Sequence, residues 1–124
     1  MNEQEVDLFL DTCFKQLREY WEFFLCAFRT GMRLGELLGL KWGDIDWNQK
    51  FIKVERSYKK GRFDKTKNGK VRRVDMSDQL IFSLRKLLTL RKKQALKLGL
   101  GEPVEIVFHR NGKAIFHKSK NSNV

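Results

Sequence analysis

The sequence predicts an α+β domain that is mainly helical, with a small antiparallel sheet of about three strands that carries a basic β-hairpin. Its 124 residues suit one domain, and a chain of this length buries roughly two-thirds of its unfolded surface, enough for a hydrophobic core. Long segments space their apolar residues as one face of a helix does, and shorter segments alternate as strands do. We therefore expect residues 1–124 to form a single domain.

Three helices are predicted in the first 40 residues. The first begins near Asn2 or Glu3, because acids occupy its first turn and apolar residues recur at helical spacing. Its apolar face consists of Val6, Phe9, Leu10, Cys13, Phe14 and Leu17. Residues 20–28 are apolar nearly all round, which is typical of a central buried helix, and Gly31 suits its C-cap. A short helix over residues 34–40 comes next.

The remaining elements are a long helix and short strands. Ser77 is a good N-cap for a helix over residues 78–98, which Gly99 follows. Segments that alternate in polarity predict strands over 51–56, 70–76 and 104–108. The turn signals Gly61 and Asn68-Gly69 lie between the first two of these strands, so we expect a cationic hairpin there.

Positive charge is concentrated in the middle of the chain. The 26 Lys and Arg exceed the 15 Asp and Glu, which gives a formal net charge of +11. Residues 1–49 hold five basic and nine acidic residues, residues 50–73 hold eleven and two, and residues 74–124 hold ten and four. So dense a cluster of cations favours a polyanionic partner, usually nucleic acid and less often an anionic membrane surface. The alternative is a solvated face that only aids solubility.

The composition argues against a secreted, membrane-spanning or metal-binding protein. Cys13 and Cys26 both fall within helical apolar patterns, which predicts reduced, buried thiols in a cytoplasmic protein. The acidic N-terminal segment does not resemble a secretory signal, and no apolar run approaches the roughly 18 residues of a membrane span. With two His and no CxxC, the sequence offers no zinc ligand set, and we expect no metal and no cofactor.

Two motifs carry a resemblance to a known family. Residues 30–46 read TGMRLGELLGLKWGDID. This stretch resembles the first arginine segment of the tyrosine recombinase (phage integrase) family, T-G-x-R-x-x-E-L-x-x-L-x-W-x-D-I-D, and meets every fixed position. Residues 64–74 resemble the family's hairpin lysine motif, T-K-x-G-x-x-R-x-V/I, although Asp75 stands where the family usually has Pro. The resemblance covers roughly residues 3–116.

The resemblance implies site-specific cutting and rejoining of double-stranded DNA. In the family a tyrosine attacks the scissile phosphate, forms a 3′-phosphotyrosyl bond and releases a 5′ hydroxyl. The bond energy is kept in that link, so the resemblance implies neither ATP nor a metal. The implied partner is double-stranded DNA, and no membrane is implied.

Arg33 and Glu36 are the catalytic candidates of the arginine segment. The Arg33 guanidinium offers a planar fork of donors to two phosphate oxygens, where negative charge builds up in the transition state. Glu36 resembles the glutamate that supports the active-site cations, because a carboxylate beside an arginine keeps its fork aimed. The alternative is a surface pair between Arg33 and Glu36, one helical turn apart.

Lys67 matches the family's hairpin lysine, the general acid that protonates the leaving 5′ oxygen. An amine can do this only if neighbouring cations or desolvation lower its pKa. Lys65 is the neighbour most easily confused with it, and the alternative for Lys67 is an ordinary contact to the DNA backbone. The remaining candidates for DNA binding are Lys59, Lys60, Arg62, Lys65, Lys70, Arg72 and Arg73.

Two parts of the family's machinery have no match in this sequence. Neither His109 nor His117 fits the second segment, H-x-x-R, and we expect both to be ordinary surface residues. Tyr20 and Tyr58 are out of order for the nucleophile. We therefore expect this chain to be the first part of a catalytic domain, inactive by itself but able to bind DNA. Because family members assemble on DNA through C-terminal tails, we expect a parent that is oligomeric on DNA and a monomer for this segment.

Two other functions are compatible with parts of the sequence. A non-catalytic basic module that binds nucleic acid would explain the charge but not the arginine segment. The other is a protein-interaction domain whose charge is incidental, which a lack of DNA retention at low salt would favour.

Overall fold

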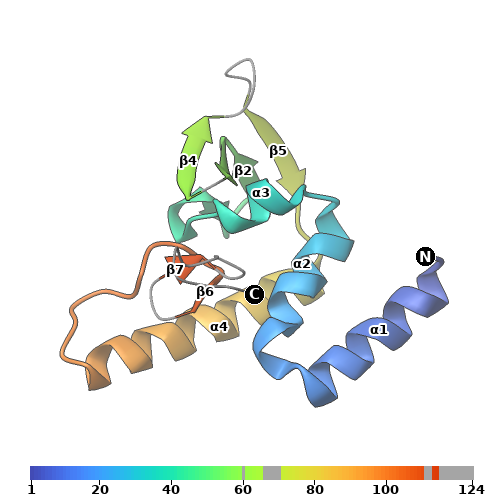
Figure 1. Cartoon of the computed structure of the whole chain (residues 1–124), viewed down its shortest axis with the longest axis horizontal. Helices are drawn as coiled ribbons and strands as arrows, with labels where there is room; N and C mark the ends of the chain where they lie inside the picture. The colour runs from blue at the N-terminus through green and yellow to red at the C-terminus, as the bar shows by residue number, and fades with distance from the viewer. Residues whose placement is uncertain (60, 66–70, 111–112, 115–124) are drawn as a thin grey trace, which may run out of the picture.

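The computed structural model describes residues 1–59, 61–65, 71–110 and 113–114 (Figure 1). The α-helices are α1 (Glu3–Gln16), α2 (Trp21–Thr30), α3 (Leu34–Leu38) and α4 (Asp78–Lys97), and the 3₁₀ turns are η1 (Arg18–Tyr20) and η2 (Trp42–Asp44). The strands are β1 (Ile45–Asp46), β2 (Phe51–Val54), β3 (Arg56–Lys59), β4 (Arg62–Lys65), β5 (Arg72–Asp75), β6 (His109–Arg110) and β7 (Lys113–Ala114). The predicted α+β class is confirmed.

The predicted helices are confirmed, and their ends follow the capping signals. The Asn2 side chain accepts a hydrogen bond from the backbone N–H of Glu5 at 2.8 Å, so α1 begins at Glu3. Gly31 ends α2 in the left-handed conformation, at φ 68°. Ser77 caps α4 by accepting from the Leu80 N–H at 3.2 Å. Local signals therefore determine where the helices begin and end.

The strands pair differently from the predicted single hairpin. β2 lies between β1 and β5 in an antiparallel sheet, with Val54 opposite Arg72. The chain leaves this sheet at Glu55, and β3 pairs with β4 instead. We expected residues 59–70 to be a turn region, so β4 was missed. Phe63 is the one apolar residue of β4, and it lies opposite Tyr58 with the two ring centroids 4.9 Å apart.

The strand predicted over residues 104–108 is wrong. This segment is irregular and is held by two backbone hydrogen bonds, from Trp42 N–H to Glu105 O and from Val107 N–H to Leu40 O, each 2.9 Å long. Val107 and Phe108 are adjacent in sequence and both are buried. Apart from an isolated bridge between Ile106 and Lys41, the segment forms no ladder, and its irregular backbone carries both side chains into the core.

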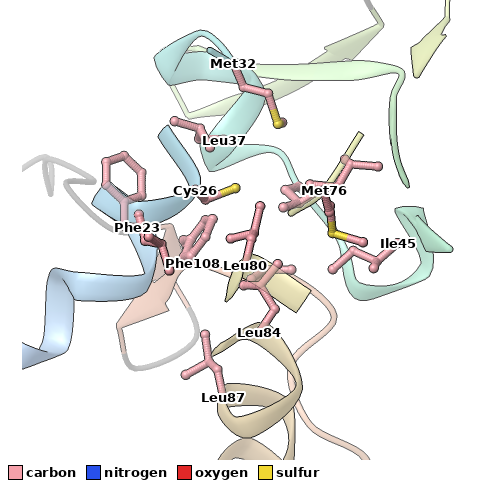
Figure 2. Packing of buried hydrophobic residues seen from close by; sticks show 14 of the residues in the cluster. Phe23, Cys26, Met32, Leu37, Ile45, Met76, Leu80, Leu84, Leu87 and Phe108 are labelled. Atoms are coloured by element: carbon pink, nitrogen blue, oxygen red, sulfur yellow. The ribbon is translucent and has the colours of Figure 1, made fainter. Parts of the chain in front are cut away.

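The hydrophobic core lies between α2, α3, α4 and the three-stranded sheet (Figure 2). Phe23 and Cys26 from α2, and Leu80 and Leu84 from α4, point into it. The two cysteines are buried free thiols, as predicted. The rest of the labelled core comprises Met32, Leu37, Ile45, Met76, Leu87 and Phe108.

α1 covers the core only in part. Leu10 and Cys13 are buried, and the Phe9 ring makes edge-to-face contacts with the Phe24 and Phe28 rings of α2. At the C-terminal end of its predicted apolar face, Phe14 is half exposed. None of the helices in the described ranges has the length and apolar composition needed to cross a membrane.

Candidate nucleic-acid interface

Arg33 stands at the start of α3 with its side chain exposed to solvent. The turn before it is tied by Thr30, whose hydroxyl donates to Cys26 O at 2.6 Å and accepts from Met32 N–H at 3.2 Å. Met32 is buried and anchors the turn in the core. Among the described residues no carboxylate lies within ion-pair distance of the Arg33 guanidinium. Its donors are therefore available to a ligand.

Glu36 is a buried carboxylate that joins the arginine segment to β5. One carboxylate oxygen, Oε1, accepts the Arg33 backbone N–H at 2.9 Å and Nη2 of Arg72 at 2.8 Å. The other, Oε2, accepts Nη1 of Arg72 at 2.5 Å. Hydrogen bonds from Arg72 hold the pKa of Glu36 below its ordinary value of 4.5, against the opposing effect of burial. The carboxylate is thus kept ionised and fixed at both oxygens.

The pairing of Glu36 with Arg72 was not identified from the sequence. The sequence suggested an ion pair between the Arg33 and Glu36 side chains as the alternative, but Glu36 bonds to the Arg33 backbone instead. The signal for Arg72 was available, because it is the fixed arginine of the hairpin lysine motif. Only the fold shows that this arginine, 36 residues further along the chain, faces the glutamate.

The other candidate cations of the strands differ in what they contact. Lys59 and Arg62 are exposed and lie directly opposite each other on β3 and β4. Like charges in this position repel each other unless a polyanion lies nearby. Arg73 is exposed too, with its guanidinium 4.4 Å from the ring centroid of Phe51.

Several predicted residues lie outside the part of the chain that the structure describes. Lys60, Lys67 and Lys70 are among them, and for Lys65 only the backbone position on β4 is described. The general acid and these DNA contacts therefore remain predictions.

A second ion pair with a buried carboxylate connects the arginine segment to β3. Nη1 of Arg56 lies 2.5 Å from Oδ2 of Asp44 and donates to Gly39 O at 3.3 Å, and Nη2 donates to Glu55. Asp44 also accepts the Lys41 backbone N–H at 2.9 Å. Asp44 is a fixed position of the arginine segment, and the structure shows that it binds Arg56, which the sequence pattern indicated only as part of a strand.

His109 is half-buried, so its prediction as an ordinary surface residue is wrong. Burial, together with the nearby charge of Arg91, lowers the pKa of His109 to about 4. Nη2 of Arg91 donates to the backbone oxygen of His109 at 3.4 Å. His117 lies outside the described residues. Tyr20 and Tyr58 are partly buried and pack against the core.

The described residues offer no evident metal centre. Within those ranges no three His, Cys, Asp or Glu side chains gather closely enough to hold a metal ion.

The comparisons with known proteins agree with the two motifs. The profile of the Phage integrase family matches residues 1–122. A tyrosine recombinase XerC-like protein of Caldanaerobacter subterraneus subsp. tengcongensis is 36% identical over an alignment covering 78% of this chain and 30% of that protein.

Solved structures share the fold. The Tn1549 transposon integrase in complex with a circular intermediate DNA has a TM-score of 0.74 at 19% identity, covering 93% of this chain and 39% of that one. The XerA recombinase has a TM-score of 0.64 at 24% identity, covering 92% and 36%. The chain thus spans less than two-fifths of the length of each of these proteins. On the family match over nearly its whole length, the chain belongs to the phage integrase family.

Proposed function

We propose that this chain forms the phosphate-binding part of the catalytic domain of a site-specific DNA recombinase. The observation that carries the proposal is the arrangement around Glu36. One oxygen of this buried carboxylate accepts a hydrogen bond from the Arg33 backbone N–H, and both oxygens accept hydrogen bonds from the Arg72 guanidinium of β5. The Arg33 side chain is left exposed, with its guanidinium available to a phosphate.

In the proposed reaction a tyrosine hydroxyl supplied from outside this chain attacks the scissile phosphorus. A phosphorus–oxygen bond to the tyrosine forms while the bond to the 5′ oxygen breaks, which leaves a 3′-phosphotyrosyl link. The proton of the tyrosine hydroxyl passes to a base that the proposal also places outside this chain. Arg33 donates to the nonbridging oxygens, whose negative charge increases in the transition state. Lys67 gives its proton to the departing 5′ oxygen and is left as a neutral amine.

Duplex DNA is the proposed partner, and the β3–β4 hairpin is its proposed contact. Lys59 and Arg62 support this, because two exposed cations held directly opposite each other favour a polyanion between them. Lys60, Lys65, Lys70 and Arg73 belong to the same proposed surface. Arg72 has a double role, since its guanidinium is committed to Glu36 while about half of its side chain stays exposed. We further propose that the chain is cytoplasmic and monomeric without DNA, and that its parent assembles on DNA.

The proposal is tested in a protein that supplies the tyrosine. A chimera would carry residues 1–116 in place of the equivalent segment of a complete tyrosine recombinase, and cleavage of a nicked recombination site would be measured. We expect Arg33→Lys to lower the cleavage rate about 100-fold or more, because lysine keeps the charge but loses the two-donor fork. Binding to the site should change little.

Arg62→Lys is the matched control, because it makes the same change at a cation expected to contact only the DNA backbone. Equal cleavage by the Arg33→Lys and Arg62→Lys chimeras would contradict the proposed catalytic role and favour a non-catalytic basic module. A covalent adduct formed by the 124-residue chain alone would also contradict the proposal, since no tyrosine here is expected to act as nucleophile.

A further inference from the structure

α3 and its C-cap residue Gly39 lie very close to β3, so that a side chain would overlap β3 at Gly35 and would be tightly packed at Gly39. A Cβ atom at Gly35 would overlap Oγ of Ser57 and lie 3.2 Å from the backbone oxygen of Tyr58. A Cβ at Gly39 would lie 3.2 Å from Cγ of Arg56 and 3.3 Å from the Tyr58 nitrogen. Gly35 and Gly39 are four residues apart, so they share one side of the helical turn. That side faces the backbone of β3.

Glycine at position 35 runs against local preference. It is a poor residue in a helix interior, because it loses more backbone freedom on folding than alanine does. Its φ is not in the left-handed region, so the conformation alone does not require glycine. By contrast, a Cβ at Gly43 or Gly101 would meet nothing within 4 Å. Tertiary contact with β3 is therefore the reason for glycine at Gly35.

The β3–β4 hairpin depends on this contact for its placement. Within the described residues β3 and β4 pair only with each other, separately from the sheet of β1, β2 and β5. Besides the chain connection at Glu55 and the packing of Tyr58 against the core, β3 is held by α3 and by Arg56, which donates to Gly39 O and binds Asp44. Both contacts are made by residues of the arginine segment, which also carries the exposed Arg33.

We propose that Gly35 and Gly39 are positioning residues that seat the β3–β4 hairpin on α3, so that Arg33 and the hairpin cations meet DNA as one rigid surface. The DNA part of this inference rests on the proposed function, whereas the seating of the hairpin does not. A side chain at position 35 shifts the hairpin relative to Arg33. For alanine the main obstacle is the Ser57 hydroxyl, which the added Cβ would overlap. A larger side chain also presses on the Tyr58 carbonyl, which is backbone and can yield only if the strand moves.

The experiment compares Gly35→Val with Gly43→Val in the 124-residue chain. Amide hydrogen exchange would be measured for each strand, and affinity for a duplex DNA would be measured between 50 and 200 mM NaCl. In Gly35→Val we expect faster exchange in β3 and β4 with little change in β2 and β5. We also expect the slope of log K against log salt to fall by about two units, as when two phosphate contacts are lost. Gly43→Val should leave both readouts as in the wild type.

Adding Ser57→Ala to Gly35→Ala tests whether the overlap with the Ser57 hydroxyl causes the defect. A general loss of stability would not be reversed by this second change. In Gly35→Ala it removes the overlapping hydroxyl and leaves the Ser57 Cβ at 3.6 Å, an ordinary contact distance. The double variant should therefore regain most of the exchange protection that Gly35→Ala loses in the hairpin.

Three outcomes would overturn the inference. The first is that Gly35→Val has the same exchange rates and salt slope as the wild type, and the second is that its exchange is as much faster in α2 and α4 as in β3 and β4. The third is that Ser57→Ala fails to restore the protection that Gly35→Ala loses. Absence of any DNA binding by the wild-type chain would count against the proposed function and the DNA part of the inference. The exchange measurements would then test by themselves whether Gly35 and Gly39 position the hairpin on α3.

Discussion

At the scale of single residues, Glu36 does more than a surface ion pair could. A buried carboxylate is stable only when its oxygens are paired, and here both are bound. Because Arg72 remains about half exposed, the pair keeps part of its hydration, which limits the cost of burying it. The same carboxylate accepts the backbone N–H of Arg33, the N-cap residue of α3. A change at Glu36 therefore affects both the turn that carries Arg33 and the position of β5.

We expect Glu36→Gln to lower the free energy of unfolding by about 1–3 kcal/mol at neutral pH, because Arg72 loses its charged partner. The wild type should also lose stability as the pH falls through the lowered pKa of Glu36, below 4.5. In that range the unfolded chain already holds the proton and the folded chain must take it up. Urea unfolding of both proteins as a function of pH measures this. Parallel curves below pH 4.5 would show that Glu36 makes no such contribution.

At the scale of elements, the ends of the helices position the candidate site. α2 ends at Gly31 with φ 68°, and the chain reverses there to place Arg33 at the start of α3. α4 is followed by Gly99 at φ 75°, far from this turn in sequence. A Cβ at either glycine would meet nothing within 4 Å, so backbone conformation alone requires glycine at both. The two glycines differ in the segment that each one leads into, because only Gly31 leads into the turn that carries Arg33.

This difference gives a matched pair of variants. Gly31→Ala and Gly99→Ala should each cost about 1–2 kcal/mol of stability, because alanine is strained in the left-handed region. Only Gly31→Ala should also weaken binding to duplex DNA, since it disturbs the turn that carries Arg33. Thermal unfolding and fluorescence anisotropy with a labelled duplex measure the two effects. Equal loss of DNA affinity in both variants would indicate that reduced stability, and not the turn, is responsible.

At the scale of the whole molecule, negative and positive charge are separated along the chain. Residues 1–49 carry a net charge of −4 and supply α1, α2 and α3, whereas residues 50–73 carry +9 and supply β2, β3 and β4. α4 packs its apolar side into the core and runs along the end of the molecule away from β4 and β5 (Figure 1). Its exposed lysines therefore provide positive charge at a distance from the hairpin.

The position of charge, and not its amount, should determine DNA binding. We expect the paired change Lys59→Gln and Arg62→Gln to lower the salt slope of duplex binding by about two units. Lys92→Gln with Lys93→Gln removes the same charge from α4 and should change the slope much less. Anisotropy titrations over a range of salt measure both. Equal slopes for the two double variants would contradict the hairpin as the DNA contact.

The sequence by itself determined the helices, their caps and the family, because these depend on short-range spacing. The i, i+3, i+4 pattern, the caps at Asn2 and Ser77 and the glycine at the end of α2 act within a few residues, so they can be read along the chain. The same is true of the arginine segment, which is a continuous motif. Arg33 and Lys67 were identified in this way, and their roles remain predictions.

Only the tertiary structure decided which strands pair and which charges meet. Strand pairing depends on which backbones come together in the fold. The sequence of residues 51–59 does not show that the chain leaves one sheet at Glu55 and enters another. The pairs Glu36–Arg72 and Asp44–Arg56 join residues 36 and 12 positions apart, and burial selects these partners from many charged residues. A buried carboxylate needs hydrogen-bond donors, and the packing of the folded chain determines which donors lie close enough to bind it.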